Sequence, residues 1–248
     1  MDVDATAGPL AAVGDHEAAR RAVVPLALAT LAVGIPLDAS AAWWAQPVVS
    51  LWTWGVLLWI AAGAGAAERR ALAACVVLAT SGEVFLKDVW GLYEYRLHNL
   101  PLFIPPGHAL VYAAASRLGR AAPGWLPGAV GAGFVVYAVA AAATGLDTFG
   151  IPWCLAFLGY LAVSGNRRLC ATLFLVALAI ELYGTALGGW RYVTVEPWFG
   201  LTTTNPPVWI GAVYCTLESL VRLVAGRRES SQVVARKSLA GRPAGALL

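Results

Sequence analysis

The stretch GEVFLKDVWGLYEYRLHNLPLFIPPGHALVY, residues Gly82 to Tyr112, decides how the chain folds. It places an ionisable residue, Glu83, deep in an apolar run, and the chain then enters another apolar run through Pro105, Pro106 and His108. A second stretch of the same plan, ELYGTALGGWRYVTVEPWFGLTTTNPPVWIGAVY, occupies residues 181–214. The rest of the chain is interpreted as a scaffold that holds these two stretches against one another.

The composition is that of a membrane protein. Of the 248 residues, 59% are hydrophobic and only 12% are charged, and the mean hydropathy is +0.69. A soluble surface needs about twice that share of charged residues. A helix needs roughly 20 apolar residues to cross a bilayer core about 30 Å thick. Within that core each backbone N–H and C=O group must be hydrogen-bonded inside the protein, because no water is present. Strand-like alternation is not seen, so the sequence predicts an all-α, polytopic membrane helix bundle.

Eight apolar runs are interpreted as membrane-spanning helices, and the sixth is short and begins with Gly150 and Pro152. They cover residues 22–37, 47–67, 71–90, 102–118, 126–145, 149–165, 169–188 and 205–224. With the amino terminus inside, fourteen of the seventeen Lys and Arg residues fall on the cytoplasmic side. Only Lys87, Arg96 and Arg191 fall outside, which fits the positive-inside rule. The sequence therefore predicts a multi-pass protein of the inner (plasma) membrane with both termini in the cytoplasm.

The boundaries of these runs predict three regions. Residues 1–19 are expected to be a disordered cytoplasmic tail, 20–225 the transmembrane domain, and 226–248 a basic cytoplasmic tail beside anionic lipid. Near-constant offsets of 98 to 102 residues suggest a tandem four-helix repeat, 20–120 and 125–225, whose copies run in the same direction. Chance alignment of common membrane residues is the alternative. The offsets relate Glu83 to Glu181, Trp90 to Trp190, Pro105-Pro106 to Pro206-Pro207, and Tyr112 to Tyr214.

Several functions are excluded by what the sequence lacks. The net charge of +3 comes from basic pairs between apolar runs, which do not form a nucleic-acid-binding stripe. The four cysteines form no CxxC pair, and three histidines are too few for a multi-histidine iron site. Gly-rich phosphate loops, GxSxG, HExxH and aspartate-rich magnesium motifs are missing. We therefore expect no metal and no cofactor.

Glu83 and Glu181 are the predicted catalytic residues. An acidic residue at mid-bilayer costs about 2.5–3.5 kcal/mol even on lenient scales, so it is expected to face the bundle interior. Desolvation favours its protonated form, which is a proton donor. The structural alternative for Glu83 is a pair with Lys87, four residues on, whereas Glu181 has no cation at that spacing. Glu218 has Arg222 at that spacing and is interpreted as a salt-bridged residue.

His108 and two outer loops supply the other candidates. His108 follows Pro105-Pro106 and is expected to point into the bundle near Glu83 as a third catalytic residue; the alternative is a buried histidine bonded to a carbonyl. The prolines free backbone carbonyls at two helix mouths, which suggests a pocket opening toward the outer leaflet. Interfacial anchoring would explain the loop aromatics alone but not the Arg and Asn beside them. The predicted substrate-binding residues are Trp90, Tyr93, Tyr95, Arg96, Asn99, Trp190, Tyr192, Asn205 and Trp209.

Two blocks of about sixty residues in all carry a family resemblance. GLYEYRLHNLPLFIPP and ELYGTALGGWRY, followed by WFGLTTTNPPVWIG, resemble the integral membrane carotenoid hydratases of bacteria and archaea. The resemblance implies acid-catalysed addition of water to a terminal isoprenoid double bond. It points to Glu83, Tyr93, Tyr95, Glu181 and Tyr192 as the residues involved. The small membrane-bound terpene cyclases, which also protonate an alkene or epoxide with buried carboxylates, are a neighbouring possibility.

These patterns together predict an integral membrane enzyme, a hydratase or cyclase of lyase or isomerase type. Its glutamates would act as general acids on an apolar, isoprenoid-like small molecule or lipid. The competing hypothesis is a proton-coupled transporter or lipid-binding membrane protein, because parallel repeats and midplane carboxylates suit a carrier as well. A purely structural membrane subunit is the third alternative.

Overall fold

The chain forms a helical bundle with a small sheet at one end. The computed structural model describes residues 9–40 and 44–240, and the side chains of 21–40 and 44–226. This part of the chain contains eight α-helices, one π-helix and two short strands. They are α1 Pro9–Ser40, α2 Ala45–Gly63, α3 Ala66–Glu83, η1 Val84–Val89, β1 Tyr93–Tyr95, α4 Ile104–Ala121, α5 Leu126–Ala143, α6 Gly150–Val163, α7 Arg167–Ala186, β2 Trp190–Tyr192 and α8 Ile210–Ala240.

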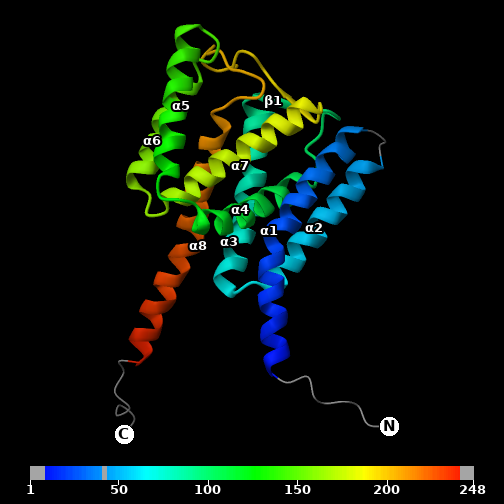
Figure 1. The fold of residues 1–248 in the computed structure, drawn as a ribbon, viewed down its shortest axis with the longest axis vertical. Helices are drawn as coiled ribbons and strands as arrows, with labels where there is room; N and C mark the ends of the chain where they lie inside the picture. Colours follow the sequence, from blue (N-terminus) through cyan, green and yellow to red (C-terminus); the bar gives the residue numbers. More distant parts are fainter. Residues whose placement is uncertain (1–8, 41–43, 241–248) are drawn as a thin grey trace.

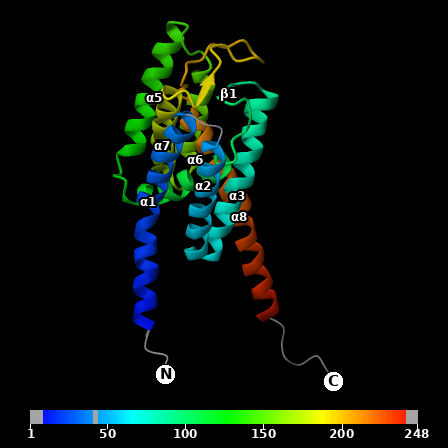
Figure 2. The ribbon, with the colours of Figure 1, turned by 90° about the vertical axis from the view of Figure 1, so that its right-hand side faces the viewer.

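The helical prediction is confirmed in its coarse form. Four helices are long and apolar enough to cross a membrane, namely Arg21–Ser40, Ala45–Gly63, Leu126–Ala143 and Arg167–Ala186. The apolar helix α6 is shorter, as its sequence predicted. The outermost described residues of α1 and α8 lie at the same end of the molecule (Figures 1 and 2).

Both terminal helices extend beyond the apolar runs. α1 already begins at Pro9, so residues 9–19 are helical where a disordered tail was predicted, and α8 continues to Ala240 through most of the predicted basic tail. The composition explains both differences, since residues 10–20 are rich in alanine and residues 227–240 contain neither Gly nor Pro. The ends of the predicted tails, residues 1–8 and 241–248, lie outside the described residues.

Helix α4 lies at the centre of the bundle, packed against α1, α3 and α7 (Figure 1). Its first residues are Ile104, Pro105 and Pro106; proline is favoured there because the first turn needs no N–H donor. Small residues let other backbones approach α4 closely. A Cβ on Gly119 would lie 3.0 Å from the Cα of Leu169 on α7. α4 therefore fixes the distance between the two halves of the chain.

Two elements depart from the all-α prediction. The third apolar run is not one α-helix: α3 ends at Glu83, and the chain continues as the π-helix η1. Such π-turns are rare and often lie at functional sites. Strands β1 and β2 pair antiparallel, with Tyr93 opposite Tyr192 and Tyr95 opposite Trp190. In each strand the first and third residues are buried and the second is exposed. The aromatic side chains of both strands therefore point into the bundle.

Candidate active site

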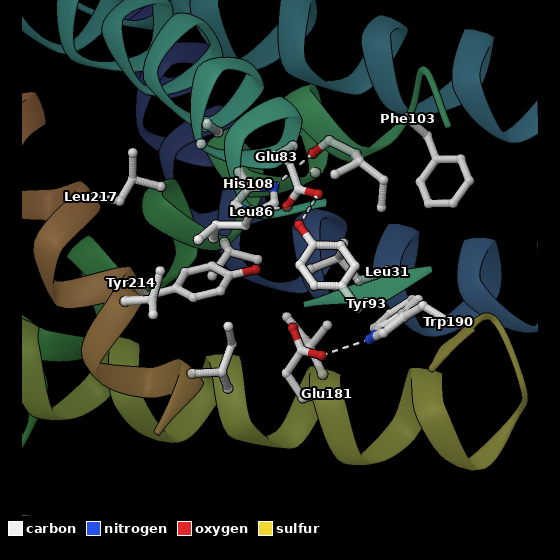
Figure 3. A pocket seen from close by; sticks show the side chains of 18 of the residues that line it. Leu31, Glu83, Leu86, Tyr93, Phe103, His108, Glu181, Trp190, Tyr214 and Leu217 are labelled. Carbon is white, nitrogen blue, oxygen red and sulfur yellow. Dashed lines mark hydrogen bonds and ion pairs between the residues drawn. The ribbon is translucent and has the colours of Figure 1, made fainter. Parts of the chain in front are cut away.

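A cavity of about 250 Å³ lies between the helices beneath the two strands. Its walls come from α1, α2, α3, η1, α4, α6, α7, α8 and both strands. Most of the lining side chains are apolar, and the carboxyl groups of Glu83 and Glu181 both face the same space. Figure 3 shows these carboxyls on opposite walls with the ring of Tyr93 between them. The cavity is therefore an apolar chamber with two acidic groups.

Glu83 is held by three side chains. It is 8% exposed, and its Oε2 accepts hydrogen bonds from the phenols of Tyr93 and Tyr95, each at 2.6 Å. Its Oε1 lies 3.3 Å from Nε2 of His108. The predicted alternative, a pair with Lys87, does not form: the Lys87 ammonium lies 2.7 Å from Asp88 and 3.3 Å from Glu94. Lys87 thus bonds acidic residues of η1 and β1 and does not line the cavity.

Glu181 is held by neutral donors. It is 6% exposed, and its Oε2 accepts hydrogen bonds from the indole of Trp190 at 2.6 Å and the phenol of Tyr192 at 3.0 Å. Trp190 reaches this position because Gly184, one turn after Glu181, has no side chain. A Cβ there would lie 2.0 Å from the indole ring. Within the described part of the chain, both side-chain donors thus reach the same oxygen of Glu181.

The two carboxyls are linked through the paired strands. Tyr93 and Tyr192 stand opposite each other in the register, and their ring centroids are 5.0 Å apart. Burial is the main factor that raises the pKa of both phenols well above the ordinary value, and a nearby glutamate adds to it. Both phenols therefore remain protonated and act as hydrogen-bond donors.

The hydrogen-bond geometry of His108 fixes where one of its protons lies. Nδ1 is 3.0 Å from the carbonyl oxygen of Ile104, and because a carbonyl only accepts, Nδ1 must carry hydrogen. Nε2 faces Oε1 of Glu83. The imidazole of His108 and the second carboxyl oxygen of Glu83 therefore lie close enough to form an ion pair when His108 is protonated. Among the described residues, the side-chain donors to Glu181 are the neutral groups of Trp190 and Tyr192.

Tyr214 is a site residue that the sequence prediction missed. Its ring stacks on His108 with centroids 5.1 Å apart and planes 8° from parallel, and it lines the cavity. The signal was present, since Tyr112 and Tyr214 matched in the proposed repeat, but nothing in the sequence indicated which of the two would face the cavity. Tyr112 packs instead beside the smaller hydrophobic cluster of Ala109 and Ala113.

Seven of the twelve predicted site residues line the cavity. They are Glu83, Tyr93, Tyr95, His108, Glu181, Trp190 and Tyr192. Asn205 does not line the cavity but contacts a residue that does. Its side-chain oxygen accepts a hydrogen bond from the backbone N–H of Tyr192 at 3.0 Å. Trp209 is fully buried behind the cavity wall and donates to Thr203 at 2.8 Å. These two residues position the strand that holds Glu181.

The remaining predicted binding residues, Trp90, Arg96 and Asn99, organise the outer loops. The Arg96 guanidinium donates to the carbonyl of Asp38, and Asn99 donates to Gln46 at 2.6 Å, so both tie the first loop to α1 and α2. Trp90 stacks on Trp198 with centroids 4.5 Å apart. Arg96 and Asn99 were predicted as binding residues because interfacial anchoring does not explain Arg and Asn in these loops; in the structure their polar groups bond α1 and α2.

Glu196 is a buried carboxylate that the prediction did not include. It is 0% exposed and accepts hydrogen bonds from the Trp90 indole and from the backbone N–H groups of Trp198, Phe199 and Leu201. Burial alone would raise the pKa of Glu196, but these donors together lower it below the ordinary value. The signal in the sequence is a glutamate before a Pro-x-x-Gly turn. Glu196 therefore holds the second loop in a closed turn and ties it to Trp90 in the first loop.

Glu218 pairs with Arg222 as predicted, at 3.7 Å from its Nε. Glu218 is 1% exposed, and neither carboxyl oxygen has a hydrogen-bond partner among the described residues. The four cysteines are buried and free. In residues 21–40 and 44–226, whose side chains are described, no group of three or more His, Cys, Asp or Glu could hold a metal ion.

Comparison with known proteins gives no relative: no family model, curated protein or solved structure matches the chain.

Proposed function

We propose that the protein is a membrane-embedded enzyme that protonates an alkene or epoxide of an apolar, isoprenoid-like substrate. The observation that carries the proposal is the difference between the two carboxyls of one apolar chamber. Among the described residues, Glu181 accepts hydrogen bonds from the neutral donors Trp190 and Tyr192, while the second oxygen of Glu83 lies 3.3 Å from the imidazole of His108. Groups whose surroundings differ in this way are suited to opposite acid and base roles.

Glu181 acts as the general acid. In an apolar wall without a cation, its protonated form is favoured, because an unpaired charge would be poorly solvated. Both of its donors reach Oε2, so Oε1 is the atom that carries the proton toward the substrate. The O–H bond breaks, the π electrons of the alkene form a new C–H bond, and a neighbouring carbon becomes a cation.

The aromatic rings around the chamber stabilise that cation. Tyr93, Tyr95, Tyr192, Trp190 and Tyr214 all line the cavity. A cation over an aromatic face gains about 0.5–1 kcal/mol at exposed sites and about 2 kcal/mol or more where water is excluded. Several rings on different walls would protect a carbocation from premature loss of its proton.

The Glu83–His108 pair completes the reaction as the base. In hydration, a water oxygen bonds to the cationic carbon and the pair removes the extra proton, so the product gains one water. In cyclisation, a second double bond attacks the cation and the pair removes a proton from carbon, so the product is an isomer. The resemblance to carotenoid hydratases implies the first outcome, and the terpene cyclases illustrate the second. In both outcomes the proton must return to Glu181 before the next cycle.

Mass spectrometry of lipids from cells with and without the protein tests the proposal. We expect a product that is heavier by one water or is an isomer of equal mass. Glu181→Gln should reduce its formation by about 10²–10⁴-fold, the usual contribution of a general acid. Glu218→Gln is the matched control, since Glu218 is equally buried but does not line the cavity. Full product formation by Glu181→Gln would refute the assignment.

A proton-coupled carrier of apolar molecules is the second candidate. The contact between the Glu83 carboxyl and the His108 imidazole favours it, since a carrier needs a site that is alternately protonated and deprotonated. Reconstituted vesicles separate the two functions. A carrier gives a substrate-dependent pH change inside the vesicle and no new covalent product, whereas the enzyme gives the product without a pH gradient.

We further propose that all eight α-helices cross the inner membrane, as two parallel four-helix repeats with cytoplasmic termini. The clustering of fourteen basic residues supports this topology. So does the recurrence of one order of elements, in which a helix bearing a buried glutamate precedes a short aromatic strand, a double proline and a further helix. A parallel repeat explains why the two glutamates face one chamber.

A further inference from the structure

We propose that the substrate reaches the cavity sideways from the bilayer, through a slot between α3–η1 and α8. This inference rests on the apolar substrate of the proposed function, and it adds the route and the shape of that substrate. The first observation concerns exposure. Among the residues that line the cavity, only Phe85, at 41%, and Leu220, at 42%, are strongly exposed on the surface of the described chain. The chamber therefore meets the surface between η1 and α8.

The walls of the slot are two apolar rows. Leu78, Gly82 and Phe85 follow one another along α3 and η1 at steps of four and three residues. Residues at these spacings share one helix face, so the row forms a continuous wall from the bundle surface toward Glu83.

The opposite wall repeats this spacing on α8. Val213, Leu217 and Leu220 are also four and three residues apart, and all three line the cavity. α3 and α8 are neighbouring helices, and both rows line the same cavity, so the two rows face one shared space. Neither row contains a charged residue. A lipid chain can lie between them without leaving an apolar environment.

Gly82 keeps the slot open. Close packing does not require a glycine at position 82, because a Cβ atom placed there would have no neighbouring atom within 4 Å. Gly119 and Gly184 are different, since a Cβ on either would press against a neighbouring helix or ring. A missing side chain beside Glu83, at a place where nothing fills the space, leaves room for a ligand.

The size of the chamber sets the form of the substrate. A volume of about 250 Å³ is below the roughly 300–1,000 Å³ of pockets that enclose a drug-sized ligand. A long isoprenoid cannot fit inside it whole. The slot solves this problem, because the reactive end enters the chamber while the rest of the chain stays between the two rows and in the bilayer. The chamber and slot together thus suit a long apolar chain that enters with one end first.

A photoreactive lipid chain tests the slot without requiring catalysis. The full-length protein is reconstituted in vesicles that contain a long-chain alcohol with an alkyl diazirine at its end. After illumination, labelled peptides are mapped by mass spectrometry. We expect labelling of the peptides that contain Glu83 and Glu181 in the wild type. Gly82→Trp should reduce this labelling to background, because the indole fills the slot.

Gly55→Trp is the matched control. Gly55 is an exposed helical glycine on α2 that does not line the cavity, and it too has no atom within 4 Å of a Cβ. It should leave labelling unchanged. Leu220→Trp narrows the slot from the other wall and should reproduce the loss, which guards against a folding defect specific to residue 82. Gly82→Ala should label like the wild type.

The outcomes separate this proposal from the proposed function. Unlabelled cavity peptides in the wild type, or labelling that persists in both Gly82→Trp and Leu220→Trp, would overturn the slot. Loss of labelling in those variants, together with a Glu181→Gln protein that still forms product, would keep the slot and reject the acid. Lost labelling with no covalent product in the wild type would leave a lipid-binding or carrier role for the chamber.

Discussion

At the scale of single residues, the roles of the two glutamates depend on the donors that each one receives. A carboxyl that accepts both hydrogen bonds on one oxygen is oriented by them, and the other oxygen is left to face the cavity. Glu181 has this arrangement through Trp190 and Tyr192, and in Glu83 the second oxygen faces His108. Substitution of a single donor therefore tests orientation without removing the acid.

Tyr192→Phe removes the 3.0 Å hydrogen bond to Glu181 but keeps the ring. One such bond is worth about 0.5–1.5 kcal/mol, so we expect kcat to fall by roughly 2- to 13-fold with little change in KM. Tyr160→Phe is the control, because its phenol bonds Thr216 and the ring does not line the cavity. Equal losses in both variants would argue against a specific role for Tyr192.

Glu196 makes a pH-dependent contribution to stability. Its pKa is lowered in the folded protein, so the contribution is fully present above the unfolded-state value of about 4.3 and is lost as pH falls through the folded pKa. Both carboxylate oxygens of Glu196 accept hydrogen bonds, whereas the amide of Glu196→Gln has only one acceptor oxygen. We expect a lower thermal midpoint for Glu196→Gln at neutral pH, and convergence with the wild type in acid. A midpoint difference that persists unchanged in acid would contradict this assignment.

Much of the site was predictable at this scale because a buried charge in a membrane is costly. That cost singled out Glu83 and Glu181, and proximity in sequence brought in Tyr93, Tyr95 and Trp190. The partner of Arg96 could not be predicted in this way; its guanidinium reaches a backbone carbonyl on α1. The hydrogen-bond partner of a polar loop residue depends on which groups the tertiary fold places nearby. The local sequence around the residue does not predict that partner.

At the scale of secondary structure, close backbone approach sets the site. The indole of Trp190 can lie against α7 only because residue 184 lacks a Cβ. The positions of the helices could be predicted from the apolar runs. The π-helix η1 and the two strands could not be predicted in this way. A three-residue strand has too little alternation to be recognised, and its register depends on what packs beneath it.

Gly184→Ala tests this close approach. The added Cβ must displace Trp190 or move α7, and overpacking of this kind usually costs about 1–3 kcal/mol. We expect a lower thermal midpoint and a loss of product formation, because Glu181 loses its 2.6 Å donor. Gly133→Ala in α5, where no atom lies within 4 Å, should be neutral or slightly stabilising. An active, stable Gly184→Ala protein would show that the indole is not needed there.

At the scale of the whole molecule, two helical halves enclose one chamber. The described ends of α1 and α8 lie at the same end of the bundle (Figure 2), and basic residues gather in the sequence segments predicted to be cytoplasmic. The bundle class was predictable from hydropathy alone. The position of the chamber was not, because it depends on α4 lying between α1, α3 and α7.

Reporter fusions test the topology. A reporter that is active only in the cytoplasm should be active after fusion to either terminus, and one that is active only outside should be silent at both. A fusion in the outer loop at residue 97 should give the opposite result. Opposite locations of the two termini would mean an odd number of membrane crossings and would exclude the eight-span arrangement.

The short ladder between Tyr93–Tyr95 and Trp190–Tyr192 also constrains how the sequence can change over evolutionary time. A substitution in one strand changes the surface against which the facing ring of the other strand packs. Mutations at facing positions should therefore occur as compensating pairs. An alignment of homologues should therefore show covariation between positions 93 and 192 and between 95 and 190. The two segments would then be tied to a common history at this ladder, although they are free to diverge elsewhere.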